Sequence, residues 1–173
     1  MSKKIPNFEF IKKELRKKTY GILSTIDQNG NSHSTSILYA VSPPESKFAL
    51  YILTEKHYKK VKNVENNNSI SFVIPFPHHF LRFVPANCVQ FQGNGKIVPY
   101  NNSEAQQAFI NGPKILKMNI KQVGKMNSEN EDPVFIKILP KKNLYCYGVG
   151  LSLMELRKNI ESGSYSVLIP QDV

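Results

Sequence analysis

The sequence predicts a mainly β fold, an antiparallel barrel of about six short strands with a few helices at its periphery. Short segments rich in β-branched and aromatic residues alternate with turn-forming residues, and the helical patterns between them are brief. The 173 residues are 40% hydrophobic and 21% charged, which is typical of a globular chain. We therefore expect one domain over residues 1–173, with an N-terminal helix within residues 1–18 and a C-terminal extension over residues 149–173.

The first helix is predicted to run from Asn7 to about Lys17. Asparagine is a preferred N-cap residue. Apolar side chains recur along the segment at helical spacing, at Phe8, Ile11 and Leu15. These three side chains are expected to pack against the core.

A β-hairpin is predicted next, with strands at residues 21–26 and 31–41 joined by a turn at 27–30. The turn ends in glycine, and both flanking segments alternate in polarity. Successive side chains of a strand point to opposite faces, so His33, Thr35, Ile37 and Tyr39 share one face of the second strand.

The remaining elements are predicted from the same two patterns, which are alternating polarity for strands and apolar residues at helical spacing for helices. Strands are expected at residues 47–53, 69–74, 88–98, 134–139, 143–147 and 166–169, and helices at 57–67, from 103 onward, at 113–123 and at 151–160. Gln106 stands in the capping-box position relative to Ser103. Prolines between residues 75 and 85 indicate a long loop. The strands at 134–139 and 143–147 are expected to form a last hairpin.

The chain is strongly basic, with 23 basic and 13 acidic residues, a net charge of +10 and a pI of about 9.6. Such a charge is common in nucleic-acid-binding proteins. The aromatic residues interleaved with cations that would stack on bases are missing from this sequence, however. Lysines on a helix are usually its solvated face. A nucleic-acid-binding barrel is therefore a disfavoured alternative.

Membrane and metal functions are also disfavoured. No apolar run approaches the roughly 18 residues of a membrane span, and the first residues carry no apolar signal core. Cys88 and Cys146 lack the spacing of a metal site, and the four histidines form no ligand cluster in the sequence. We expect a cytoplasmic protein with no membrane association and no metal.

One segment indicates a phosphate-binding site. Thr54 ends a predicted strand, and Lys59 and Lys60 follow at the start of the next predicted helix. Together they offer a hydroxyl, two cations and the backbone N–H groups of a helix N-terminus, which can converge on one phosphate. A lysine pair on a helix is also common as a solvated surface, so residue chemistry alone leaves both interpretations open.

Five segments occur in a defined order after the first helix, between about residues 10 and 98: GILSTIDQNG at 21–30, HSTSILY at 33–39, YILT at 51–54, YKKVKNVENN at 58–67 and VQFQG at 89–93. Their order and spacing resemble the pyridoxamine 5′-phosphate oxidase-like family, the FMN-binding split β-barrels. The resemblance implies a six-stranded antiparallel Greek-key split barrel. It also implies a homodimer with the flavin at the interface.

The resemblance assigns candidate cofactor contacts. Thr35, Ser36 and Ile37 would lie along the ring and ribityl chain of FMN. Its phosphate would be held by Thr54, Lys59 and Lys60. Asn63 and Glu65 match the helix signature of the family and are expected to be structural. The implied activity is that of an FMN-dependent oxidoreductase acting on an unassigned small molecule, in which the flavin carries the electrons and no catalytic side chain is assigned.

The sequence departs from the true oxidase of this family. The oxidase closes over its vitamin substrate with an arginine-bearing segment that contains tryptophan, whereas this chain has no tryptophan. Cys88 also stands where the oxidase has an amide side chain. Oxidation of pyridoxamine phosphate is therefore not expected. The alternatives are a split barrel that binds F420 or haem, and a flavin carrier or sensor without turnover.

Overall fold

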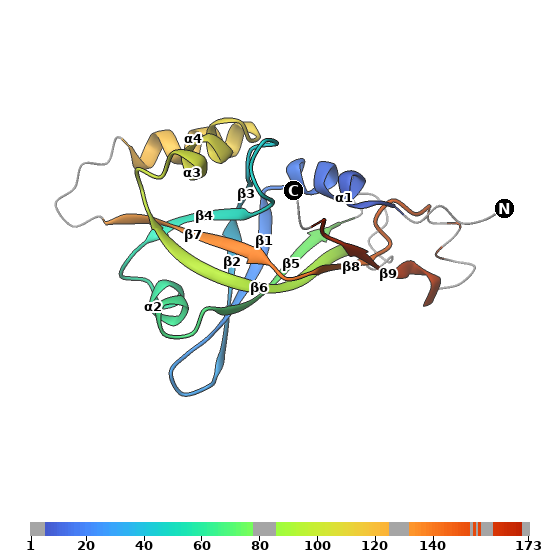
Figure 1. The fold of residues 1–173 in the computed structure, drawn as a ribbon, viewed down its shortest axis with the longest axis horizontal. Coiled ribbons are helices and arrows are strands. Elements are labelled where there is room, and N and C mark those ends of the chain that lie inside the picture. Colours follow the sequence, from blue (N-terminus) through green and yellow to red (C-terminus); the bar gives the residue numbers. More distant parts are fainter. Residues whose placement is uncertain are drawn as a thin grey trace.

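The computed structural model describes residues 6–77, 86–124, 132–152, 154, 156 and 161–170. Within these residues a nine-stranded antiparallel sheet curls into a half-barrel with four α-helices around it (Figure 1). The mainly β split-barrel class is confirmed, with nine strands in place of six. One reason for the larger number is that the predicted strand at 31–41 is divided into two.

The elements follow one another in the order α1 (Phe8–Arg16), β1 (Tyr20–Ile26), β2 (Ser32–Leu38), β3 (Ala40–Val41), β4 (Leu50–Glu55), α2 (Lys59–Asn66), β5 (Ser69–Phe76), β6 (Asn87–Pro99), α3 (Ser103–Ile110), α4 (Lys114–Val123), β7 (Pro133–Pro140), β8 (Asn143–Tyr147), the 3₁₀ turn η1 (Glu161–Gly163) and β9 (Ser164–Leu168). The strand order in the sheet is β2-β1-β5-β6-β7-β4-β3, and β8 pairs with both β6 and β9. Strands β2 and β4 lie close to each other without being hydrogen-bonded partners, and we call the place where they meet the split.

The N-terminal helix α1 forms as predicted. The side-chain oxygen of Asn7 accepts a hydrogen bond of 3.0 Å from the Phe10 backbone N–H, which caps the first turn. Phe8, Ile11 and Leu15 are buried in the main core. The apolar stripe read from the sequence is thus the face that holds the helix on the barrel.

The predicted β-hairpin is also confirmed, although its second strand ends early. Gly30 adopts a positive φ of 83°, which glycine allows at little cost, and its N–H closes the turn onto the Asp27 carbonyl. The ladder ends at Leu38. There Tyr39 turns inward, where it is fully buried and donates to the Leu15 carbonyl. The inward turn of the chain at Tyr39 therefore ends β2 before β3 begins.

The long strand β6 organises the sheet. One of its edges pairs with β5 from Asn87 to Asn94. Its other edge pairs with β8 from Cys88 to Gln90 and then, further along, with β7 from Gly93 to Pro99. The prediction that β7 and β8 form a hairpin is therefore wrong. The 13 residues of β6 are long enough for both strands to lie in succession on one edge, and the Lys141 N–H continues the ladder onto Gln92 between them (Figure 1).

One further sequence prediction changes, at helix α3, and another is confirmed in the C-terminal extension. Helix α3 is capped by Asn102, whose side-chain oxygen accepts from the Ala105 N–H, so the capping box at Ser103 is wrong. Gln106 instead donates to the Tyr100 carbonyl. The predicted strand at 166–169 is confirmed as β9. Most of the predicted helix at 151–160 and of the predicted loop at 75–85 lies outside the described residues.

Two apolar clusters stabilise the protein. The larger cluster fills the barrel and includes Phe72, whose ring packs against Tyr39 and Phe91. The smaller cluster lies between the sheet and the α3–α4 pair and centres on Phe135, which contacts the ring of Phe109. None of the described helices is long and apolar enough to cross a membrane.

We expect Gly93→Ala to lower the free energy of unfolding by about 2 kcal/mol, the scale of overpacking in a close contact. A Cβ at this position would lie 2.6 Å from the backbone oxygen of Leu139, which cannot move without disturbing the β6–β7 ladder. Denaturant unfolding of Gly93→Ala and of Asn94→Ala, its exposed neighbour, checks this. Equal stabilities of the two variants would contradict the register of β7 on β6.

Candidate functional site

A cavity of about 360 Å³ lies at the split of the barrel, where β2, β4, α2 and α4 approach one another. Its volume lies within the roughly 300–1,000 Å³ range of small-molecule sites. The lining residues come from four parts of the chain: Ile37, Leu38, Leu53, Thr54, Glu55, Tyr58, Lys60, Asn119 and Val123. Of the six residues predicted to bind the cofactor, Ile37, Thr54 and Lys60 are therefore brought together.

Thr54 lines this cavity and carries an unsatisfied hydroxyl. The residue is only 8% exposed, near the end of β4. Its Oγ1 atom is buried and has no hydrogen-bond partner among the described residues. Leaving a buried hydroxyl unpaired costs about 1–3 kcal/mol, and such groups are rare in native structures. A polar ligand atom in the cavity would remove this cost.

Lys60 places a cation in the same cavity. It is the second residue of α2 and is half-buried, and this burial lowers the pKa of its ammonium group. The ammonium lies 4.2 Å from the ring centroid of Tyr58, and within the described parts of the chain it has no acidic partner. Helix α2 has neither a capping side chain nor an acidic residue in its first turn. The partial positive charge at the N-terminus of α2 therefore adds to the positive potential that Lys60 creates in the cavity.

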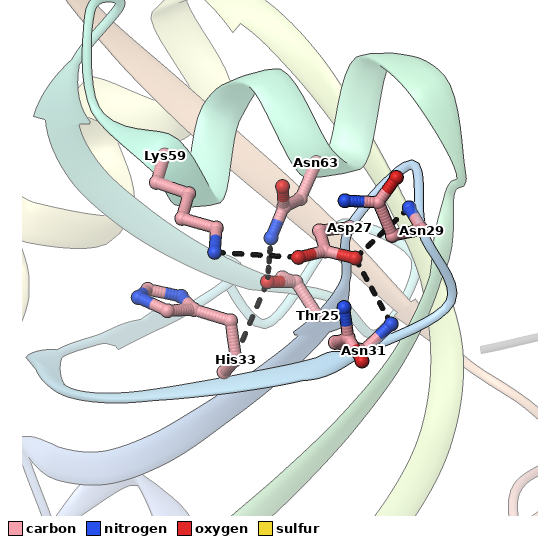
Figure 2. Close-up of polar contacts among 7 residues, drawn as sticks. All are labelled: Thr25, Asp27, Asn29, Asn31, His33, Lys59 and Asn63. Carbon is pink, nitrogen blue, oxygen red and sulfur yellow. Dashed lines mark hydrogen bonds and ion pairs between the residues drawn. The ribbon is translucent and has the colours of Figure 1, made fainter.

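Lys59 is directed away from the cavity. Figure 2 shows its ammonium pointing at Asp27 in the β1–β2 turn, and the distance from Nζ to Oδ2 is 3.4 Å. Asp27 also accepts from the backbone N–H groups of Asn29 and Asn31. The hydrogen bond from Asn31 is the main cause of the lowered pKa of Asp27, and the Asn29 and Lys59 contacts add to it. The two lysines of the motif therefore occupy different environments.

Asn63 fastens α2 to the hairpin. Its side chain is 4% exposed, and Nδ2 donates a 2.9 Å hydrogen bond to Thr25 Oγ1. The Thr25 hydroxyl in turn donates to the carbonyl of His33 on β2 (Figure 2). This is the structural role expected for Asn63. It sets the position of the helix that carries Lys60.

The β2 residues divide between two faces. The Oγ1 atom of Thr35, on the same face as Ile37, is buried and unpartnered within the described structure. Ser36 lies on the opposite face, is exposed, and is hydrogen-bonded to the hydroxyl of Tyr20 at 3.0 Å. Its side chain therefore points away from Thr35, and only its backbone is available on the side of the split.

The cavity also contains residues that the sequence did not identify. Tyr58 stands directly before the lysine pair, and its aromatic ring could have been noted from that position. Glu55 brings a carboxylate whose Oε2 is buried without a partner in the described residues. Asn119 and Val123 come from α4, far along the chain, and no local pattern connects them to Thr54.

A protein-family model described as pyridoxamine 5′-phosphate oxidase matches residues 8–142. The chain belongs to this family. The match covers α1 to the end of β7 and both sides of the cavity, so the resemblance seen in the sequence is confirmed. No curated protein sequence matches the chain significantly.

Solved structures share the fold of this pyridoxamine 5′-phosphate oxidase family member. The heme storage protein HutZ of Vibrio cholerae is 16% identical with a TM-score of 0.61, covering 83% of this chain and 96% of HutZ. A heme binding protein of Mycobacterium smegmatis is 12% identical with a TM-score of 0.63, covering 85% of this chain and 56% of that protein. The conserved hypothetical protein Rv2991 of Mycobacterium tuberculosis is 19% identical with a TM-score of 0.57, covering 79% and 82%.

The acid stability of the protein should depend on Asp27. Its folded-state pKa lies below its ordinary value of 3.8, so its contribution to stability is present above that pH and is lost as the pH falls through the folded pKa. Asp27→Asn keeps a hydrogen-bond acceptor in the turn but removes the titrating group. We expect a shallower loss of unfolding free energy below about pH 4, measured by urea unfolding between neutral and acid pH.

The control for this experiment is Asp132→Asn. Asp132 lies 3.5 Å from Lys56 in an ion pair whose two side chains are mainly exposed, and exposed pairs contribute little to stability. This variant should retain the acid sensitivity of the unmodified chain. The same shallow profile in both variants would show that Asp27 has no special role.

Proposed function

We propose that this protein binds FMN in the cavity between β2 and β4 and acts as an FMN-dependent oxidoreductase. The observation that carries the proposal is the convergence of an unpaired buried hydroxyl, Thr54 Oγ1, and a partly desolvated cation, Lys60, at the positive end of α2. A phosphate monoester satisfies all three at once. Family membership places such cofactors among those expected.

The residues of the cavity fit the two ends of FMN. Thr54 would donate a hydrogen bond to the phosphate, and Lys60 would balance its charge. Ile37 and Leu53 offer apolar contact to the ring system. Thr35 lies on the same face of β2 as Ile37 but does not itself line the cavity, and its buried hydroxyl would contact the polyol chain only in the proposed complex. FMN itself would supply the two-electron chemistry. The protein would orient the ring and exclude water from it.

The lysine pair has an unequal role in this proposal. Lys60 lines the cavity, whereas the Lys59 ammonium is engaged by Asp27. We infer that Lys60 is the main cation for the phosphate and that Lys59 chiefly fixes the turn against α2. Further parts of the proposal are a homodimer with flavin at its interface and a cytoplasmic location. It does not include pyridoxamine phosphate oxidation.

Haem is the second candidate, because two proteins of similar fold are named for binding or storing it. A haem protein needs an axial ligand such as histidine, cysteine, methionine or tyrosine. Among the described residues that line the cavity only Tyr58 belongs to these types. The Thr54 hydroxyl and the Lys60 ammonium group favour a phosphate ester over haem. F420, which also carries phosphate, is kept as a third candidate.

The cofactor should be recognisable by absorption of the purified protein. We expect a yellow protein with flavin bands, whose chromophore is released on denaturation and co-migrates with FMN. Bleaching by NADH or NADPH without oxygen would identify a reductase, whereas a bound flavin that neither nucleotide nor any tested donor reduces would indicate a carrier or sensor. A Soret band from stoichiometric haem would contradict the FMN proposal.

Substitutions in the cavity should separate phosphate binding from stability. Lys60→Ala is expected to weaken FMN binding by about 30-fold, or about 2 kcal/mol, the scale of a charge-assisted contact. Lys59→Ala should weaken it several-fold less, because that ammonium faces Asp27. The exposed Lys62, two residues further along α2, provides the matched control as Lys62→Ala. Fluorescence titration with FMN measures each affinity.

Thr54→Val provides an independent measurement. It should weaken FMN binding by about tenfold through the lost hydrogen bond. It should also leave the cofactor-free protein as stable as before or more stable, because an unsatisfied buried hydroxyl is removed. Unchanged FMN affinity in both Thr54→Val and Lys60→Ala would remove the proposed phosphate site.

A further inference from the structure

A second hollow, of about 400 Å³, lies between α3 and α4. It is lined by Tyr100, Gln106, Ile110, Lys117, Ile120 and Lys121. None of these residues lines the cavity at the barrel split. Helix α4 separates the two spaces, because Asn119 and Val123 line the first cavity and Lys117 and Lys121 line the second.

Hydrogen bonds and ring packing hold the walls of this hollow in place. Tyr100 donates from its hydroxyl to the Ile120 carbonyl at 3.2 Å, and its own carbonyl accepts from Gln106 Nε2 at 3.0 Å. The ring of Tyr100 stacks on Phe135 with an interplanar angle of 4° and centroids 5.8 Å apart. Tyr100 thus ties both helices to the core. The hollow is a pre-formed feature of the fold.

The chemistry of the lining combines apolar surface with uncompensated positive charge. Ile110 is 46% exposed although it is a large apolar residue, and the partly buried Tyr100 and the buried Ile120 form the floor beside it. Lys117 and Lys121 stand one turn apart on α4, and no carboxylate in the described residues pairs with either. Like charges at this spacing destabilise a helix. An anion between the two ammonium groups would relieve that repulsion.

We propose that the hollow between α3 and α4 binds a small amphipathic anion. An apolar or aromatic body would lie against Ile110, Ile120 and Tyr100, and a carboxylate or sulfonate would lie between Lys117 and Lys121. None of the described residues that line the hollow is acidic, which disfavours cationic and zwitterionic ligands. The proposal is independent of the cofactor assigned to the other cavity. It also gives a role to the lysines of α4 that phosphate binding at the split does not use.

The test uses 1-anilinonaphthalene-8-sulfonate as the probe, followed by its fluorescence on binding to the full-length protein. Exchange of both cations, Lys117→Gln with Lys121→Gln, should weaken saturable binding by about tenfold, as expected for the loss of two partly solvated charge contacts. Ile110→Asp should weaken it at least as much. Lys114→Gln is the matched control, because Lys114 is exposed on the same helix but does not line the hollow.

Two comparisons decide whether the probe occupies this site. The uncharged analogue N-phenyl-1-naphthylamine should bind less tightly and should not respond to the lysine exchange. Saturating FMN and the Lys60→Ala exchange should leave the binding of the anionic probe unchanged. No saturable binding, equal affinity in the double lysine variant, or displacement by FMN would each overturn the proposal. Whether FMN binds at the split is decided separately, by the FMN titrations of Lys60→Ala and Thr54→Val.

Discussion

The rest of the structure depends on strand β6, which is long enough to pair with three other strands. Its 13 residues carry β5 on one edge and both β7 and β8 on the other. This arrangement bends the sheet and brings β4, through β7, round towards β2. Because β2 and β4 meet without hydrogen bonds between them, the barrel has a split. A ligand cavity can form there without breaking the core.

Several of the buried polar atoms that have no partner in the described structure belong to residues at the split. The buried anchor of α2 is satisfied, because Asn63 is paired with Thr25. Buried polar atoms without a partner in the described structure are also found in residues that do not line the cavity, namely Tyr51, His33 and Asn87. At the split, the hydroxyls of Thr35 and Thr54 have no partner in the described structure. Natural sequences tolerate such a cost mainly where function needs it. The contrast between a satisfied helix anchor and unsatisfied cavity atoms is the physical basis for assigning ligand binding to this side of α2.

Helix α4 links the two candidate sites. Its buried residues Leu116 and Ile120 hold it on the smaller apolar cluster. Its remaining surface is divided between the cavity at the split, reached by Asn119 and Val123, and the second hollow, reached by Lys117 and Lys121. A helix of ten residues can face the core and both spaces at once, because successive side chains of a helix point in different directions around its axis. Lys117 and Lys121 are thereby placed on a defined surface of α4.

Local patterns in the sequence determined the helix capped by Asn7, the β1–β2 hairpin and most of the strands, because caps, turns and alternation involve residues only a few positions apart. The family resemblance located Thr54 and Lys60 in the same way, as neighbours at a strand end and a helix start. Tertiary structure alone decided that β7 and β8 share an edge of β6, that Lys59 faces Asp27, and that α4 closes the cavity. Those contacts join residues distant in sequence, and their geometry is set by strand register and packing, which no short segment encodes.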